Sequence, residues 1–203
     1  MAIWCMSKCD NNFYRKLNTL IDTPNFLFDP KTLEHKFKGT KKIKDSSLPY
    51  ILPYSKDVIH NHFKKLFKDY NLRLEDTHYL ITPPYTKQSI HVDSLPNYII
   101  SCKLNITISN ENQPFVWYKK VDYNNYKFQT SAGRGYLTSM SQDEIEIERH
   151  NVNGVYLINT SYPHRTINND SAWRFCLTTS IRNKKGKFIT FKEAVEIFKD
   201  YIV

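Results

Sequence analysis

A histidine and a carboxylate stand one residue apart in the segment SIHVD, as His91 and Asp93. Side chains in a β-strand alternate between the two faces, so residues i and i+2 point the same way. A strand at this position would offer an imidazole and a carboxylate to one metal ion. The segment is therefore expected to lie in a sheet, with a further ligand supplied by a distant part of the chain.

His164, in the segment YPHRTIN, is the expected third ligand. Two histidines and one carboxylate on one face of an octahedron leave the opposite face open, as non-haem Fe(II) oxygenases require. Water, a co-substrate and O2 would occupy the open positions. Zinc is the main rival metal, because the same ligands also suit it.

Arg174 follows His164 by ten residues. Turn-forming side chains at Asn168–Ser171 predict a turn there, with a return strand beginning near Trp173. Antiparallel pairing of the two strands would bring Arg174 back beside His164. A guanidinium binds a carboxylate through two parallel hydrogen bonds, so it suits the far carboxylate of a dicarboxylic acid chelated to the iron. The natural candidate for that acid is 2-oxoglutarate.

The order of these residues resembles the Fe(II)- and 2-oxoglutarate-dependent dioxygenases, whose pattern is H-x-D, a distant H, and an R about ten residues later. The resemblance runs from about residue 79 to residue 181. Within it, the segments KLNITIS and GVYLINTSYPH are similar to core strands of that family's double-stranded β-helix. The resemblance implies a mainly β protein with flanking helices around a jelly-roll or cupin-like core.

The resemblance also implies an activity. Fe(II) would be held by His91, Asp93 and His164, and 2-oxoglutarate by the iron and Arg174. The reaction would couple O2 and decarboxylation of 2-oxoglutarate to oxidation of a C–H bond, with hydroxylation as the default outcome and demethylation by the same chemistry. The substrate class stays open between a protein side chain, a nucleobase, an amino acid and a small metabolite.

Two further positions bear on co-substrate binding. Many relatives carry a serine or threonine two residues after the arginine, whereas this chain has Cys176, and a thiol is a weak donor. The segment 97–109 alternates a mixed face, which includes Asn105, with an apolar face. If the mixed face lines the barrel, Asn105 would contact co-substrate or substrate; the alternative is an ordinary polar face. Arg165 and Lys103 are alternative holders of the far carboxylate.

The length of 203 residues fits a single domain. Residues 1–76 are interpreted as an N-terminal decoration with a helix near 56–70, and residues 77–182 as the β-helix core. Thr190 and Glu193 have the spacing of a capping box, which predicts a C-terminal helix over 190–202. In SQDEIEIERH the alternation predicts a strand with Ile145 and Ile147 facing inward.

The net charge is +9, with basic runs at 36–44, 64–68 and 182–187. Such runs would support a nucleic-acid partner, although a chain rich in Lys, Asn, Ile and Tyr also suggests a purely compositional origin. The N-terminus lacks the pattern of a signal peptide and no apolar stretch approaches the ~20 residues of a membrane span, so a cytoplasmic protein is expected.

Two other classes of protein compete with the dioxygenase hypothesis. One is a non-catalytic nucleic-acid-binding protein on the same barrel. The other is a cupin-like isomerase or metal-binding protein that uses the same ligands without 2-oxoglutarate. Arg174 is the residue that argues against the second class.

Overall fold

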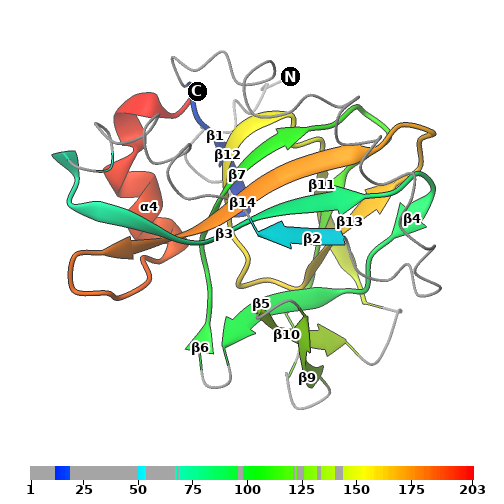
Figure 1. The fold of residues 1–203 in the computed structure, drawn as a ribbon, viewed down its shortest axis with the longest axis horizontal. Coiled ribbons are helices and arrows are strands. Elements are labelled where there is room, and N and C mark those ends of the chain that lie inside the picture. Colours follow the sequence, from blue (N-terminus) through cyan, green and yellow to red (C-terminus); the bar gives the residue numbers. More distant parts are fainter. Residues whose placement is uncertain are drawn as a thin grey trace, which may run out of the picture.

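The computed structural model describes residues 12–18, 50–53, 67, 69–95, 98–120, 122, 126–131, 134–139 and 144–203. Most of the described chain is strand (Figure 1). The strands are β1 (Tyr14–Lys16), β2 (Tyr50–Pro53), β3 (Leu72–Thr82), β4 (Thr86–Lys87), β5 (His91–Leu95), β6 (Tyr98–Ile99), β7 (Lys103–Ile108), β8 (Phe115–Tyr118), β9 (Tyr126–Ser131), β10 (Arg134–Ser139), β11 (Glu146–His150), β12 (Gly154–Ile158), β13 (His164–Asn168) and β14 (Arg174–Asn183). The helical elements are α4 (Phe191–Ile197) and the 3-10 turn η2 (Lys199–Tyr201).

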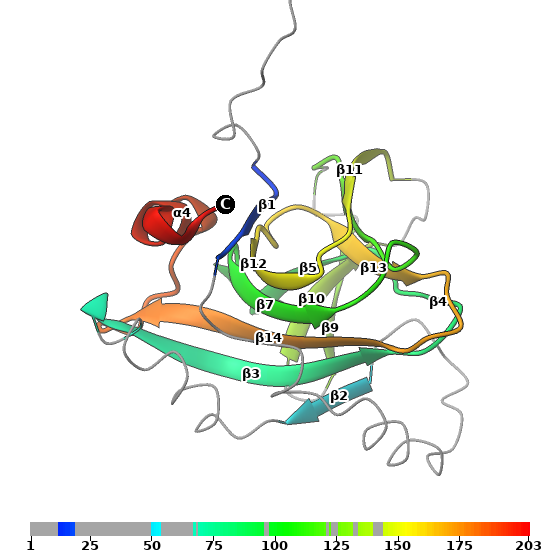
Figure 2. The ribbon, with the colours of Figure 1, turned by 90° about the horizontal axis from the view of Figure 1, so that it is seen from above.

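The strands form two antiparallel sheets that face each other. The first sheet has the order β1-β12-β7-β14-β3-β2, and the second has the order β11-β8-β13-β5-β10-β9, with β4 added beside β13 and β6 beside β5. Along the chain the core strands pass repeatedly from one sheet to the other, so neighbours within a sheet are rarely neighbours in sequence. This topology is the double-stranded β-helix, and the predicted fold class is confirmed (Figure 1, Figure 2).

The outer face of the first sheet holds the main apolar core. Alternate residues of its strands point to this face, among them Leu104 and Ile106 of β7 and Leu177 of β14. Phe191 and Phe198, in and just after α4, pack on the same cluster. Burying each such side chain contributes about 1.5–3 kcal/mol to folding, so this face anchors the sheet.

The inner face of the first sheet is polar along β7 and β14, whereas β12 adds Tyr156 and Ile158 to this face. Lys103, Asn105 and Thr107 alternate with the apolar residues of β7, and all three are buried. Register pairs them with Ser180, Thr178 and Cys176 of β14. Along β7 and β14 the interior is therefore lined by hydroxyls, an amide and an ammonium, while Phe115 and Trp117 of the second sheet pack with the residues of β12.

The C-terminal helix begins with the predicted capping box. The Glu193 backbone N–H donates to Thr190 Oγ1 at 3.2 Å, and the Thr190 N–H donates to Glu193 Oε2 at 2.6 Å. The predicted range 190–202 contains α4 and η2 as separate elements. The predicted helix near 56–70 lies mostly outside the described residues, of which Phe67 and Asp69 are helical. The predicted core boundary at residue 77 falls inside β3.

The prediction that Ile145 and Ile147 face inward is wrong. Their side chains are 63% and 40% exposed. The register of β11 against β8 shifts between Glu146 and Glu148, so strict alternation fails at Ile147. Among the strands that the structure describes, β11 is also the last of its sheet on this side and has no neighbour along one edge.

The predicted pairing of the His164 strand with the Arg174 strand is also wrong. β13 pairs with β4, β5 and β8, whereas β14 pairs with β3 and β7. The turn lies in the predicted segment, but it carries the chain from the second sheet to the first instead of closing a hairpin. Strand-to-strand hydrogen bonding is satisfied by partners from other parts of the chain, so proximity in sequence does not decide the pairing.

Two buried side-chain amides hold the turn between β13 and β14 in place. Asn168 Nδ2 donates to the Pro83 carbonyl at 2.8 Å and to the Ala172 carbonyl at 2.9 Å. Gln113 Nε2 donates to Asn168 Oδ1 at 3.0 Å and also to the Ala172 carbonyl. Both side chains are 1% exposed. The turn that separates His164 from Arg174 is therefore tied to β3 and to the segment before β8.

Among the residues that the structure describes, none belongs to a helix with the length and apolarity needed to cross a bilayer.

Replacing Asn168 with alanine should lower the free energy of unfolding by about 2–4 kcal/mol, because several buried hydrogen bonds are lost together. Urea unfolding of both variants measures the effect. The control is Asn169→Ala, since the neighbouring Asn169 side chain is exposed and should change stability little. Equal losses in the two variants would contradict the role of the buried amide.

Candidate metal centre

The structure brings His91, Asp93 and His164 together. His91 and Asp93 lie on the same face of β5, and His164 opens β13, where its Cα is paired in register with His91. One potential ligand atom from each residue lies within 4.8 Å of the others, and the two imidazole centroids are 4.5 Å apart. Three ligands from two adjacent strands can thus meet at one ion.

Backbone carbonyls orient both imidazoles. His91 Nδ1 lies 2.8 Å from the Ser89 carbonyl, and His164 Nδ1 lies 2.9 Å from the Tyr162 carbonyl. A carbonyl only accepts, so each Nδ1 carries the proton and donates it. Nε2 is then the ring nitrogen that carries the lone pair, and metal-binding histidines are commonly held in this tautomer by a hydrogen bond from the other nitrogen.

His164 is kept neutral by its surroundings. It is 3% exposed and stacks on Phe115 with ring centroids 5.0 Å apart. Burial, and then the nearby His91, lower the pKa of His164 to about 4, while the Asp93 carboxylate opposes that shift. The imidazole is therefore in its metal-binding form throughout the neutral range.

Arg174 is a buried cation at the start of β14. It is 2% exposed, and its Cα is paired with that of Thr82 on β3. Cys176 contacts the guanidinium, but Nε and Nη2 are buried and have no hydrogen-bond partner among the described residues. Burial lowers the pKa of Arg174. Nε–H and one Nη2–H lie in the guanidinium plane along the same edge, and this is an edge that can donate to both oxygens of a carboxylate.

Three other predicted positions are now placed. Asn105 is 4% exposed on the inner face of β7, and its Oδ1 has no hydrogen-bond partner. Lys103 is on the same face, and its Nζ donates to Ser180 Oγ at 2.6 Å. Its charge also contributes to the lowered pKa of His164. Arg165, by contrast, lies over the Tyr118 ring at 5.1 Å, on the opposite face of β13 from His164.

The donor set fits a divalent metal, and the vacant guanidinium edge fits a carboxylate. Two neutral imidazoles and one carboxylate are the facial set that Fe(II) takes with open positions. An unpartnered buried guanidinium is costly unless a ligand completes its hydrogen bonds. The positions of Ser89 and Tyr162, whose carbonyls orient the imidazoles, could not be inferred from residue types, because any residue supplies a backbone carbonyl.

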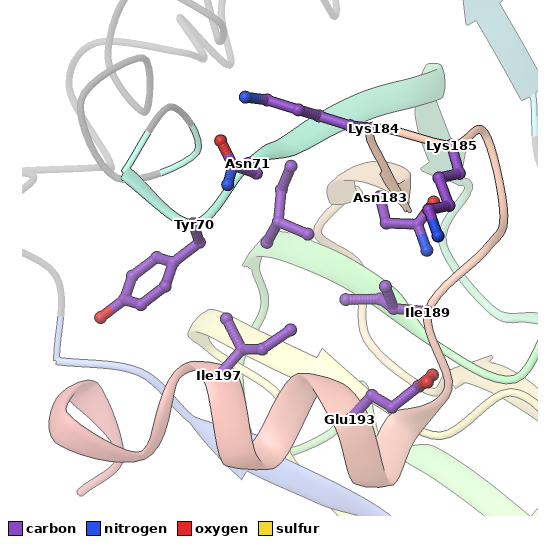
Figure 3. Close-up of a pocket in the computed structure, with 9 residues that line it drawn as sticks. Tyr70, Asn71, Asn183, Lys184, Lys185, Ile189, Glu193 and Ile197 are labelled. Carbon is purple, nitrogen blue, oxygen red and sulfur yellow. The ribbon is translucent and has the colours of Figure 1, made fainter.

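An open surface hollow of about 380 Å³ lies elsewhere, between the chain before β3, the turn after β14 and α4 (Figure 3). It is lined by Tyr70, Lys184 and Glu193 among others, and by none of the candidate ligands. Lys184, Lys185 and Lys187 are exposed here, in the predicted basic run 182–187. Arg182 instead pairs with Glu75 at 2.6 Å. The run at 36–44 lies outside the described residues, as does most of the run at 64–68.

No protein-family model matches the chain, and a search of curated proteins finds no match. Solved structures with a similar fold include EvdMO1, with 11% identity over 84% of this chain and 47% of that one, at a TM-score of 0.46. They also include ycfD of E. coli, with 14% identity over 64% of this chain and 31% of that one, at a TM-score of 0.37. An oxalate oxidase in complex with glycolate has 8% identity over 75% of this chain and 63% of that one, at a TM-score of 0.35. The chain spans less than two thirds of each of these proteins.

Replacing either His91 or His164 with alanine should weaken binding of Mn(II), a redox-stable substitute for Fe(II), by at least about 100-fold, because each removes one of three ligands. Calorimetric titration of metal-free protein measures this. His150→Ala is the control, since His150 stacks on Tyr14 at 4.0 Å and is not in the cluster. Unchanged affinity in either ligand variant would refute the assignment.

The metal-free protein should lose stability as the pH falls from about 6.5 to 4. In this window the unfolded chain binds a proton at His164 that the folded chain does not, so the stability contribution of that residue rises with pH and is lost on acidification. The loss should approach about 3 kcal/mol for a shift of this size. Thermal unfolding across this pH range would show a shallower decline in His164→Gln; an identical slope would contradict the buried neutral state.

Proposed function

We propose that this protein is an Fe(II)- and 2-oxoglutarate-dependent oxygenase that hydroxylates a C–H bond of its substrate. The observation that carries the proposal is the buried, vacant edge of Arg174 in a barrel that also holds His91, Asp93 and His164. A metal-binding protein without a dicarboxylic co-substrate has no use for a buried guanidinium with a vacant edge. That pairing of sites is the reason to prefer the oxygenase over a cupin-like metal protein.

His91, Asp93 and His164 would hold Fe(II), and Arg174 would hold the far carboxylate of 2-oxoglutarate. The bound metal and co-substrate would supply O2 activation, with 2-oxoglutarate converted to succinate and carbon dioxide. The chain's own part is to orient both imidazoles, to fix the co-substrate by a charge-assisted bidentate contact, and to exclude water through Phe115 and Trp117. Asn105 would add a polar contact to co-substrate or substrate.

The proposal is tested by anaerobic titration of metal-free protein with Fe(II) and 2-oxoglutarate. A chelated 2-oxo acid on Fe(II) gives a weak visible charge-transfer band, and the band should need both additions. Retention of zinc with no band on adding Fe(II) and 2-oxoglutarate would favour the cupin-like alternative instead.

Arg174→Leu should raise the dissociation constant for 2-oxoglutarate by about 100-fold or more, because two charge-assisted hydrogen bonds are lost. Anaerobic titration of the Fe(II)-loaded protein with 2-oxoglutarate measures this dissociation constant. Stability should not fall, since the vacant edge makes no bond within the described protein. Arg165→Leu is the matched control, being a buried arginine on the outer face of β13. If Arg174→Leu binds 2-oxoglutarate with unchanged affinity while Lys103→Met binds it more weakly, Lys103 is the residue that holds the far carboxylate.

Nucleic-acid binding stays a prediction from the net charge of +9. The exposed lysines after β14 are the described residues that favour it. Binding of a DNA or RNA oligonucleotide that weakens steeply with salt, by metal-free protein, would support that class.

A further inference from the structure

On β14, the residue beside Arg174 on the same face is Cys176, whose thiol is a weak hydrogen-bond donor. A bound carboxylate has about four lone-pair positions, and the vacant edge of Arg174 fills two of them. In a buried pocket the remaining positions need protein donors, since burying an unsatisfied charged oxygen is costly. A thiol is a poor donor for this purpose.

The strands on either side of β14 each present a buried hydroxyl at this level. Thr82 of β3 is paired in register with Arg174, and Thr107 of β7 is paired with Cys176. Their side chains are 0% and 2% exposed. Directly opposed residues in antiparallel strands have Cβ atoms about 4.5–5.5 Å apart, and diagonal neighbours stay within reach of a long side chain such as arginine.

The hydrogen bonds of both hydroxyls leave them ready to donate to an anion. Thr82 Oγ1 accepts from Gln88 Nε2 at 3.3 Å, so its own proton is directed away from Gln88. Gln88 is itself fixed, because its Oε1 accepts from the Thr166 backbone N–H at 3.3 Å. Thr107 Oγ1 donates to Cys176 Sγ at 3.4 Å, and sulfur is a weak acceptor that a carboxylate oxygen would readily replace.

We propose that the hydroxyls of Thr82 and Thr107, one from each strand that flanks β14, complete the pocket for the far carboxylate at Arg174 and make the protein selective for a dicarboxylic 2-oxo acid. This inference rests on the proposed function. In this arrangement β3 and β7 supply the hydroxyl donors that Cys176 of β14 does not provide. Thr82 and Thr107 are thus co-substrate-binding residues, with Gln88 as a positioning residue for Thr82.

The test compares two ligands that differ at the far end. 2-Oxoglutarate has the far carboxylate, whereas 2-oxobutyrate offers the same metal-chelating group without it. Dissociation constants for both are measured anaerobically with Fe(II)-loaded protein, using the charge-transfer band or calorimetry. Wild-type protein should bind 2-oxoglutarate far more tightly than 2-oxobutyrate.

Thr82→Val and Thr107→Val should each weaken 2-oxoglutarate binding by about 10-fold to 100-fold, the loss expected for one hydrogen bond to a charged group. Binding of 2-oxobutyrate should not change. Thr82→Ser and Thr107→Ser keep the hydroxyl and should retain most of the affinity. Thr77→Val is the matched control: Thr77 is buried and bonds Thr179 at 2.8 Å, on the face of β3 that also carries Tyr79 and Ile81.

Each outcome decides the inference. Valine variants that bind both ligands like the wild type would overturn it, and so would variants that lose both ligands equally, because that pattern indicates a general packing role. A wild-type protein that does not prefer 2-oxoglutarate over 2-oxobutyrate would instead overturn the proposed function. That result is obtained without any variant, so the two failures are distinguishable.

Discussion

The register of β13 against β5 is the constraint on which the site depends. It pairs His164 with His91 and so sets one imidazole beside the other on the inner face of the second sheet. Because side chains alternate along a strand, a slip of one residue would turn His164 to the outer face and bring Arg165 inward. Phe115 and Trp117 on β8, which pack against the inner face, and Tyr118, which lies under Arg165 on the outer face, both favour the observed register.

A second consequence of alternation is that the first sheet has two different faces. Its outer face is an apolar core closed by α4, which stabilises the sheet without any ligand. Its inner face can therefore carry groups that are costly to bury, namely Lys103, Asn105 and Arg174. Atoms of Asn105 and Arg174 that lack partners among the described residues reduce stability in the free protein, and under the proposed function a bound ligand would complete their hydrogen bonds. The apolar residues that stabilise the sheet and the polar residues proposed to bind a ligand thus lie on opposite faces of the same strands.

The turn from β13 to β14 links the candidate metal ligands to the arginine. Asn168 and Gln113 hold it through buried amide hydrogen bonds to the end of β3 and to the turn itself. The same end of β3 carries Thr82, and Gln88 connects Thr82 to the backbone of β13. The spacing of ten residues between His164 and Arg174 therefore reflects the length of chain needed to finish one strand, change sheets and begin the next.

The sequence by itself determined what depends on local geometry. The period of two that sets His91 with Asp93, the alternation in β7 and the capping box of Thr190 and Glu193 are all properties of neighbouring residues. The fold class was implied by the resemblance of the motif residues to a known family, and the strand topology confirms it. Only the tertiary structure decided that β13 and β14 lie in different sheets and that Ile145 and Ile147 are exposed. It also decided that Arg165 is buried on the outer face of the second sheet, whereas Lys103 is buried on the inner face of the first. These outcomes depend on which distant strands compete for each hydrogen-bonding edge, and that competition is settled by the whole barrel at once, not by any local pattern.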